Sequence, residues 1–410
     1  MSKNAKKSEH LLIPGLFLLA RLLLFLSLSL EGLRGYGDYW NFYHQASLGI
    51  PFVDYWTEFP PIFPFLSSLV YQLVGGRQHA YEYLLAFLFS IAQAGSLYYF
   101  SRIARQIFAE EQARRREWIY FALLIGLFYG WGYFDPLAVL ALMAAIYYLV
   151  RYFDIHEPQK SEVSASKWTD LKIGVILALG ALIKWFPALT LATVWKIRSP
   201  RRPLKITVIT LGMAALVWGG LYFSSPKMTT ASLISQGKKG SWETVWALID
   251  GNLHTGNFGA DVDRALPSTI RQMSGASPRI PSWLTLAFFA GLGLWGFLRA
   301  DLTDKRQAIA FVGFTFAVFL LWSPGYSPQW VLYLLPLTLL VIPDREGVLM
   351  AVILVLISLL EWPLLLSRGY FWSLWVLIPL RTFLLIVLGL RFWQGTKMVH
   401  PEGLVPDKIG

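Results

Sequence analysis

The sequence predicts an all-α fold, a polytopic bundle of transmembrane helices, and three observations lead to this prediction. The chain has 410 residues, of which 55% are hydrophobic and only 15% are charged. A soluble domain cannot bury so much apolar surface, whereas a bilayer accepts it. Eighteen Trp and nineteen Tyr suit a protein that meets two membrane–water interfaces. Finally, apolar runs long enough to span a bilayer recur along the chain.

Twelve apolar segments account for this pattern, with both chain ends in the cytoplasm and residues 1–410 forming a single membrane domain. The first segment follows Lys3, Lys6 and Lys7, and its length of about 20 residues exceeds that of a typical signal peptide, which predicts a retained helix. The expected segments are 11–30, 80–101, 118–134, 136–152, 171–184, 187–197, 204–223, 283–298, 307–322, 329–342, 347–366 and 373–391.

Lysine and arginine are distributed unevenly between the two sets of connecting loops. The loops expected inside hold most of them, for example in 114–116 and 196–205, whereas the outer loops hold few. This asymmetry orients the bundle and explains the net charge of +11 without a nucleic-acid partner. The chain contains no cysteine, which excludes disulfides, iron–sulfur clusters and thiolate zinc sites.

Residues 171–197 are expected to form a short hairpin that goes out and back within the membrane. Its turn lies at Lys184-Trp185-Phe186-Pro187, where the proline can begin the returning helix without losing a hydrogen bond. Such a hairpin leaves a dent in the outer half of the protein with Lys184 at its floor. The alternative is one long kinked helix, which would reverse the orientation of everything downstream.

Two outer segments are long enough to carry a site. The first outer loop, residues 31–79, contains the apolar stretch 62–74, which is too short to span and is expected to lie in the membrane interface. The long outer loop, residues 225–281, shows no obvious secondary structure, and loops of that length are usually functional or disordered. We expect function to reside in these two segments.

Asp38 is the candidate catalytic residue. It comes just after the first helix surfaces, so the backbone can hold its carboxylate close to the membrane, where it could accept a proton from an attacking hydroxyl. The alternative is that Asp38 caps a helix that begins at Tyr39, because aspartate is favoured at that position.

Three further acids are supporting candidates. Asp54 and Glu58 are four residues apart and would share one face if that segment were helical, although the nearby prolines disfavour a helix. Glu58 could instead tie the loop to Arg34 or Arg77. Asp135 lies before Pro136 between the third and fourth segments, which is also an ordinary turn signal.

Cations within or beside apolar segments are costly and should face the bundle interior. Lys184 is placed to bind a phosphate that reaches down from the headgroup layer, and Arg21 and Arg271 are further candidate phosphate ligands. The alternative for Arg21, and for Arg381 in the last segment, is a structural pair with a carboxylate. The carboxylates considered are Asp38, Asp135 and Glu361.

Candidate sugar or acceptor ligands lie in the long outer loop and in the rigid turn 323–329: His254, Asn257, Tyr326 and Gln329. The alternatives are that the loop residues are simply solvated and that the turn only joins two helices. The chain has no P-loop, no Gly-rich dinucleotide motif and no HExxH motif. This predicts a lipid-linked donor rather than a nucleotide sugar, and no cofactor, with a divalent metal left open.

The residues resemble the GT-C superfamily of integral membrane glycosyltransferases, and within it glycosyltransferase family 87, the polyprenol-phosphate-mannose-dependent mannosyltransferases. The resemblance is carried by five motifs in the family's order: 37–39 (GDY), 55–61 (YWTEFPP), 132–135 (GYFD), 184–189 (KWFPAL) and 327–330 (SPQW). It implies a helical bundle with an outer cavity, a polyprenyl-phosphate-sugar donor and inverting transfer. It also implies that Asp38 is the base, that Lys184 lies near the donor phosphate and that Asp135 is a second acid. The sequence departs from relatives that carry paired acids in the first loop, because Gly37 precedes Asp38; this weakens the case for a metal.

The sequence therefore predicts an inverting glycosyltransferase, with mannose as the expected sugar. The site would face the periplasm or cell exterior across the plasma (inner) membrane, and the acceptor would be a lipid or a glycan. A transporter or flippase of a lipid-linked or small-molecule substrate is the alternative, although no repeated halves with matching broken helices are evident. A non-catalytic membrane scaffold is the third possibility.

Overall fold

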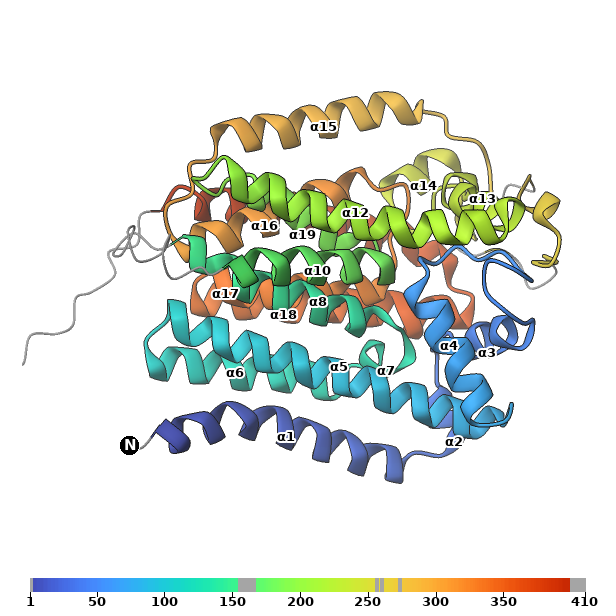
Figure 1. Ribbon diagram of the computed structural model, residues 1–410, viewed down its shortest axis with the longest axis horizontal. Coiled ribbons are helices and arrows are strands. Elements are labelled where there is room, and N and C mark those ends of the chain that lie inside the picture. The colour runs from blue at the N-terminus through green and yellow to red at the C-terminus, as the bar shows by residue number, and fades with distance from the viewer. Residues whose placement is uncertain (1–2, 154–166, 255–257, 259–261, 272–274, 399–410) are drawn as a thin grey trace, which may run out of the picture.

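The computed structural model describes residues 3–153, 167–254, 258, 262–271 and 275–398, and within them the chain is a bundle of helices without β-strands (Figure 1). Two isolated β-bridges, Pro51 with Tyr55 and Trp242 with Gly325, are the extended pairings found there. The all-α prediction is confirmed.

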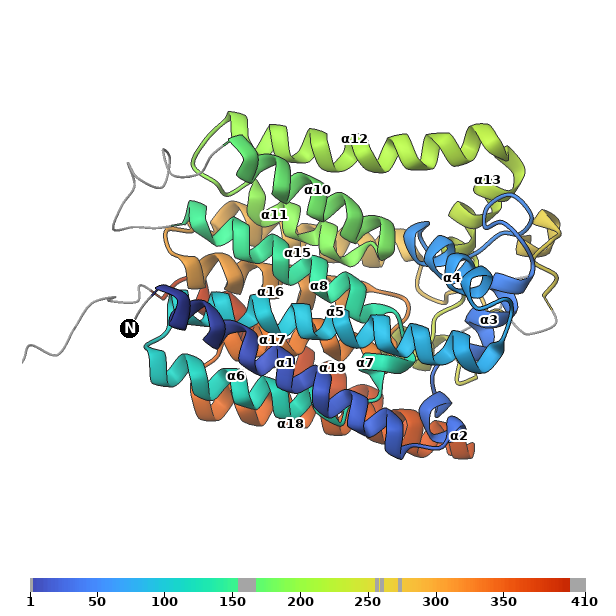
Figure 2. The ribbon, with the colours of Figure 1, turned by 60° about the horizontal axis from the view of Figure 1, so that its bottom comes forward.

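Long helices run side by side through the molecule (Figures 1 and 2). They are α1 (Lys3–Ser27), α5 (Gln78–Ile107), α6 (Glu110–Ile125), α8 (Asp135–Leu149), α10 (Lys167–Ile183), α12 (Arg201–Ser224), α15 (Ser282–Arg299), α16 (Lys305–Trp322), α17 (Val331–Val341), α18 (Asp344–Leu359) and α19 (Leu374–Gly395).

Short helices gather at one end of the bundle, on the right in Figure 1. We call this end the loop face. Its helices are α2 (Leu30–Arg34), α3 (Tyr39–Ser47), α4 (Ile62–Leu73), α7 (Tyr129–Gly132), α13 (Pro226–Ser235) and α14 (Val245–Asp250). The expected apolar stretch 62–74 is helix α4. The long outer loop, expected to lack secondary structure, contains α13, α14 and the 3-10 turns Gln236–Lys238 and Pro267–Arg271.

Among the described residues, seven helices are long and apolar enough to cross a membrane. They are Gln78–Ile107, Asp135–Tyr152, Arg201–Ser224, Ser282–Arg299, Lys305–Trp322, Arg345–Arg368 and Phe371–Gly395. Shorter apolar helices cover Leu11–Ser27, Ile62–Leu73 and Pro328–Val341. The chain is therefore a membrane protein of several spans, while the number twelve stays a prediction.

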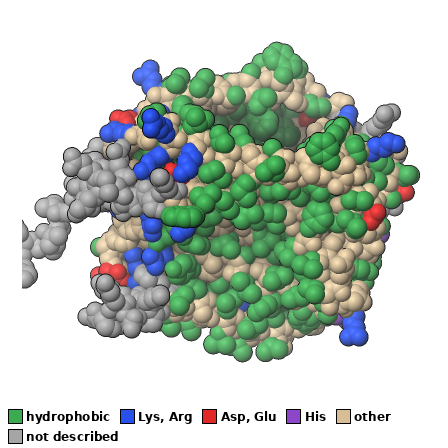
Figure 3. All heavy atoms as spheres, viewed as in Figure 1, with side chains coloured by type: hydrophobic (Ala, Val, Ile, Leu, Met, Phe, Trp, Pro, Cys, Tyr) green, Lys and Arg blue, Asp and Glu red, His purple; other side chains and the backbone are tan. Residues whose placement is uncertain are grey.

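Lys and Arg side chains gather at the end opposite the loop face, on the left in Figure 3, and hydrophobic side chains cover the middle. This end contains the α5–α6 connection, the beginning of α12 and the α15–α16 connection. The arginine-rich loops that were predicted to share one side of the membrane therefore lie at the same end of the bundle. We call it the basic face. Helix α1 begins there and α19 ends there (Figure 1).

The predicted hairpin after α10 is present, and the alternative of one long kinked helix is wrong. Helix α10 ends at Ile183, and the chain continues as a 3-10 helix (Phe186–Thr190), which packs against α10, and the short α11 (Leu191–Val194), which packs against α12 and α16 (Figure 2). The two arms touch so closely that a Cβ on Gly180 would lie 2.8 Å from a side-chain carbon of Pro187. The returning arm is too short to span, as expected.

The two arginines in the apolar helices are held by internal partners. Arg21 donates to Gln93 Oε1 at 2.8 Å and to the Leu124 carbonyl at 2.9 Å, and its guanidinium lies 4.4 Å from the centre of the Trp131 ring. It is fully buried without a carboxylate partner in the part of the chain that the structure describes. Arg381 forms an ion pair with Glu361, one of the carboxylates considered for it. Its structural role is confirmed, and the part of Arg21 in phosphate binding stays a prediction.

Candidate functional site

The first outer loop is fastened to the connection between α6 and α8, and glycines allow the contact. A Cβ on Gly37 would lie 2.7 Å from both the Cα and the carbonyl oxygen of Gly132, so the two backbones can touch only without side chains. The Asp38 amide donates to the Gly132 carbonyl at 3.0 Å, and the Tyr133 hydroxyl donates to the Tyr36 carbonyl at 2.8 Å. Two motifs that are about a hundred residues apart in the sequence therefore form one unit.

Asp38 stands at the N-cap position of α3, but its side chain makes no capping hydrogen bond. The alternative role as a capping residue is therefore wrong for the side chain. Its carboxylate instead lines a cavity of about 140 Å³ on the loop face. The cavity is walled by Asp38, Tyr133, Trp242, Glu243, Ser327, Pro328, Gln329 and Trp362. Asp38 and Gln329, both candidates from sequence, meet here.

Glu243, in the long outer loop, is the acidic residue of this cavity that sequence reasoning missed, together with the walls Trp242 and Trp362. Its φ of 50° is unusual for a residue with a side chain. Neighbours on both sides hold it: the Trp242 amide donates to the Pro324 carbonyl at 3.1 Å, and Thr244 caps α14 and donates to the same carbonyl at 2.9 Å. Arg381 donates to the Glu243 carbonyl. The backbone is thus fixed at the point where Glu243 lines the cavity.

The two carboxyl groups of the cavity titrate close to neutral pH. Burial raises the pKa of Asp38 to about 6, helped by the negative charges of Glu58 and Asp135 and opposed by Lys184 and Lys239. Burial also raises the pKa of Glu243 to about 7, against the opposing charge of Arg381. A carboxylate with a pKa near the working pH can both accept and return a proton, which is what acid–base chemistry requires.

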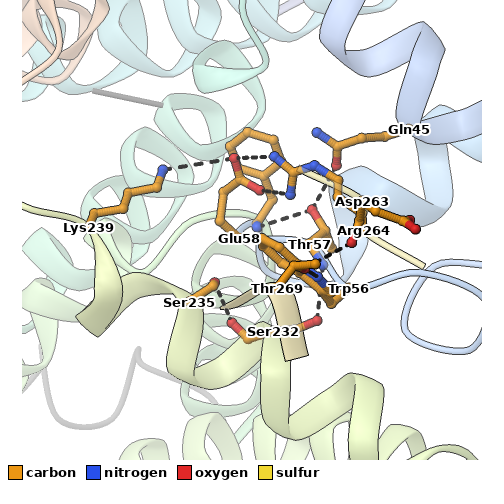
Figure 4. Close-up of polar contacts among 11 residues, drawn as sticks. Gln45, Trp56, Thr57, Glu58, Ser232, Ser235, Lys239, Asp263, Arg264 and Thr269 are labelled. Atoms are coloured by element: carbon orange, nitrogen blue, oxygen red, sulfur yellow. Dashed lines mark hydrogen bonds and ion pairs between the residues drawn. The ribbon is translucent and has the colours of Figure 1, made fainter. Parts of the chain in front are cut away.

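Glu58 is buried beside this cavity as a structural anchor (Figure 4). Arg264 donates to both of its oxygens, at 2.5 and 3.1 Å, and the Lys239 ammonium lies 3.9 Å away. Burial favours the neutral acid, but Arg264 and Lys239 outweigh it and lower the pKa of Glu58 to about 2. Glu58 therefore ties the first outer loop to the long outer loop and stays ionised.

The expectations for this part of the first loop need two corrections. Glu58 is tied to an arginine, but the partner is Arg264, because Arg34 is engaged with Glu82 at 3.0 Å. Asp54 does not share a helical face with Glu58, since the segment between α3 and α4 is not helical. Asp54 is exposed and accepts from the Ile50 amide at 2.6 Å, where it closes a turn.

Asp135 and Lys184, which the sequence suggested separately, form a pair. The Lys184 ammonium donates to Asp135 Oδ1 at 2.6 Å. It also lies 5.2 to 5.5 Å from the ring centres of Phe134, Phe186 and Trp330, an aromatic surrounding that favours a cation. Asp135 begins α8 and is 1% exposed, so it is more than a turn residue. The other oxygen of Asp135 has no hydrogen-bond partner among the described residues.

The remaining candidates are scattered. His254 is exposed, with its ring 4.0 Å from the ring of Phe371. Tyr326 is buried beneath the Arg381 guanidinium, which lies 4.0 Å from its ring centre. Asn257 lies outside the described residues, as does the side chain of Arg271, whose backbone ends a 3-10 turn. Within the described part of the chain, no group of three or more His, Cys, Asp or Glu residues could hold a metal ion.

A second hollow, entirely different in character, opens on the side of the bundle. It is an apolar groove of about 480 Å³ between α14, α15, α16 and α19, and Figure 3 shows the surface hollowed below α15. Phe289, Leu292 and Trp295 line it from α15. Residues 242–246 contribute to both hollows: Trp242 and Glu243 line the polar cavity, and Val245 and Trp246 line the groove.

No family model matches the chain, and no curated protein matches it either. Solved structures of an archaeal oligosaccharyltransferase are similar to it. The apo form of the Archaeoglobus fulgidus enzyme shares 12% identity at a TM-score of 0.48, over 97% of this chain and 57% of that one. Oligosaccharyltransferase AglB from the same organism, in complex with an inhibitory peptide and a dolichol-phosphate, shares 13% identity at 0.47, over 95% and 56%. The chain spans just over half the length of these proteins, and at TM-scores below 0.5 the assignment of a function rests on the geometry of the site.

Proposed function

We propose that this protein is an inverting membrane glycosyltransferase of the GT-C type that moves a sugar from a polyprenyl-phosphate-linked donor to an acceptor hydroxyl. Mannose is the sugar that the sequence resemblance implies, and a lipid or a glycan is the acceptor. The observation that carries the proposal is Asp38: its carboxyl group lines a polar cavity and has a pKa of about 6, so it is ionised yet able to accept a proton at neutral pH.

In the proposed reaction, Asp38 takes the proton of the acceptor hydroxyl while the hydroxyl oxygen attacks C1 of the sugar. The attack comes from the face opposite the phosphate, so the configuration at C1 inverts. The bond between C1 and the phosphate oxygen breaks, and the polyprenyl phosphate leaves with the electron pair. A nearby cation such as Lys184 stabilises the leaving phosphate, and Asp38 then returns its proton to solvent. Holding both substrates in one cavity supplies much of the rate enhancement.

The apolar groove supports a donor that carries a lipid chain. Neighbouring residues of the chain line the groove (Val245, Trp246) and the polar cavity (Trp242, Glu243), and on this basis we place the apolar tail of the donor in the groove and its charged head at Asp38. The gathering of Lys and Arg at the basic face supports a cytoplasmic position for that end, which turns the loop face to the periplasm or cell exterior.

The test is sugar transfer by the purified protein in nanodiscs, supplied with synthetic polyprenyl-phosphate-mannose and a membrane-lipid extract as acceptor. Asp38→Asn, which keeps the side-chain shape, should lose at least a hundredfold in rate. Glu31→Gln, an exposed acid in α2 of the same loop, should keep wild-type activity and serves as the matched control.

Three outcomes separate the alternatives. Transfer that disappears only in a folded Asp38→Asn supports both the reaction and the base. Transfer that survives this substitution keeps the enzyme class and moves the base to another group, with Glu243 next. If the wild type transfers none of several donor sugars but moves a labelled lipid-linked sugar across proteoliposomes, the protein is a transporter and the proposal fails.

A further inference from the structure

Lys239 is a buried cation whose nearest acid is already occupied. Its side chain is 9% exposed, and among the residues that the structure describes its closest carboxylate oxygen is Glu58 Oε1 at 3.9 Å, beyond hydrogen-bonding distance. Both oxygens of Glu58 accept hydrogen bonds from Arg264. An ammonium group has three protons to donate, and burying it without strong acceptors is costly. The contact with Glu58 alone does not explain why the positively charged Lys239 ammonium is buried here.

The second lysine of the site is different. Lys184 donates to Asp135 at 2.6 Å, so a full ion pair already compensates its charge. Within the described part of the chain, the ion pair of Lys239 is the long 3.9 Å contact with Glu58. Burial lowers the pKa of Lys239, with the positive charges of Arg264 and Lys184 adding to the effect while Glu58 and Asp38 oppose it. An added anion would therefore stabilise the charge of Lys239 more than that of Lys184.

Lys239 is also placed beside the reaction centre. Its ammonium lies 5.6 Å from the ring centre of Trp242, a wall of the polar cavity, and 5.4 Å from that of Phe258. Its charge acts on the Asp38 carboxyl, whose pKa it lowers. Figure 4 shows the side chain extended from the long outer loop toward Glu58. Trp242 is therefore shared: it lies next to the Lys239 ammonium and also lines the cavity that Asp38 lines.

We propose that Lys239 binds the phosphate of the lipid-linked donor and stabilises it as it leaves. This inference rests on the proposed function and names a residue of its donor site. The phosphate of such a donor is a diester with one negative charge. After the C1–oxygen bond breaks, the released phosphate is a monoester that carries a charge of about −1.5 to −2 at pH 7. Lys239 thus binds the leaving group more strongly than the intact donor, which lowers the barrier.

The Glu58–Arg264 pair lets Lys239 bind a phosphate without breaking the link between the first outer loop and the long outer loop. When a phosphate draws the ammonium away from Glu58, Arg264 continues to neutralise that carboxylate through its two hydrogen bonds. The first outer loop and the long outer loop stay joined while Lys239 changes partner. Lys239→Met should accordingly fold, because the hydrogen-bonded Glu58–Arg264 pair remains.

The experiment compares Lys239→Met and Lys239→Arg with Lys227→Met, which alters an exposed lysine of α13 in the same loop. For each protein in nanodiscs, the KM of the donor and the inhibition constant of polyprenyl phosphate are measured from pH 5.5 to 8. In Lys239→Met the inhibition constant should rise ten- to a hundredfold, more than the donor KM, and kcat should fall. Wild-type inhibition should tighten as pH rises through about 6, where the monoester ionises, and this dependence should flatten in Lys239→Met.

Additional ligands and variants identify what Lys239 binds and test whether the Lys239→Met substitution acts only by disturbing the structure. Inorganic phosphate tests a free anion, and nanodiscs with or without phosphatidylglycerol test a phospholipid headgroup; neither should replace polyprenyl phosphate. Polyprenyl alcohol should bind equally to the wild type and to Lys239→Met, and Lys239→Arg should recover part of the loss. Equal weakening of the alcohol, or an unchanged inhibition constant in folded Lys239→Met, would overturn the inference. If the wild type transfers no sugar yet binds polyprenyl phosphate through Lys239, the phosphate site stands and the proposed reaction fails.

Discussion

Gly37→Ala is a small change whose effect can be worked out from the packing of the first outer loop. The added Cβ would lie 2.7 Å from the Cα and the carbonyl oxygen of Gly132, whereas ordinary contacts begin at 3.4 Å. The two backbones must therefore separate by at least about 0.3 Å, and by about 0.7 Å to reach ordinary contact, because backbone atoms cannot rotate away as a side chain can. The separation also lengthens the 3.0 Å hydrogen bond from the Asp38 amide to the Gly132 carbonyl.

The loop that moves carries Asp38, so its carboxylate moves relative to Glu243 and Gln329 across the cavity. Misplacement of a reacting group by about 1 Å can cost on the order of a hundredfold in rate. We expect kcat/KM of Gly37→Ala to fall about ten- to a hundredfold in the transfer assay while the protein remains folded. The stability of the variant is followed by thermal unfolding in the same detergent.

Gly126→Ala is the matched control, because no atom lies within 4 Å of the position of its added Cβ. It should keep the wild-type rate. Gly132→Ala, whose Cβ would lie 3.0 Å from the Gly37 Cα, should behave like Gly37→Ala. Wild-type kcat/KM in a well-folded Gly37→Ala would refute the reasoning, since it would mean that the contact does not position Asp38.

Three more predictions follow from the ionised groups. Because Asp38 must be ionised to act as a base and its pKa is about 6, kcat/KM should fall about tenfold per pH unit below 6, as measured between pH 5 and 8. Glu243 has its pKa raised from 4.5 to about 7 in the folded protein, so the folded state binds more protons in that window and stability falls as pH rises through it. Glu243→Gln removes this cost of about 3 kcal/mol and should raise the Tm at pH 8 but not at pH 4; equal gains at both pH values would contradict the assignment. Glu58→Gln leaves the buried Arg264 without its ionic partner and should lower the free energy of unfolding by about 3–5 kcal/mol. The double variant Glu58→Gln/Arg264→Met should recover part of this loss, which a double-mutant cycle measures.

The helices could be predicted from the sequence because their signal is local. A sufficiently long run of apolar residues predicts a membrane helix without any information from the rest of the chain. Eleven of the twelve expected segments each contain or overlap one long helix of the structure. The hairpin after α10 was also predictable, since too few residues lie between Leu171 and Ile197 for two full spans. The helices of the long outer loop were missed because they are short and stabilised by packing rather than by propensity.

The candidate site was only half predictable, because much of its chemistry comes from contacts between distant parts of the chain. Asp38, Asp135 and Lys184 stand in short motifs at the ends of apolar segments, which drew attention to them. Glu243 has no such signal: its importance depends on Arg381, 138 positions later, and on the Pro324 carbonyl. The partner of Glu58 lies 206 positions away, and no pattern near Glu58 identifies it. The local sequence around Glu243 shows only that it lies between two tryptophans, Trp242 and Trp246.

The ion pair between Arg381 and Glu361 has a consequence for how the protein is made. An arginine at the centre of a helix resists transfer from the translocon into lipid, at a cost of about 2.5–3.5 kcal/mol. Helix α19, which carries Arg381, is therefore expected to partition into the bilayer together with α18 and its kinked end, where Glu361 lies. Only after this late insertion step can Arg381 reach the Glu243 carbonyl. A chain that ends before α19 would therefore carry every proposed catalytic group and still lack the Arg381 hydrogen bond that holds the Glu243 backbone beside the cavity.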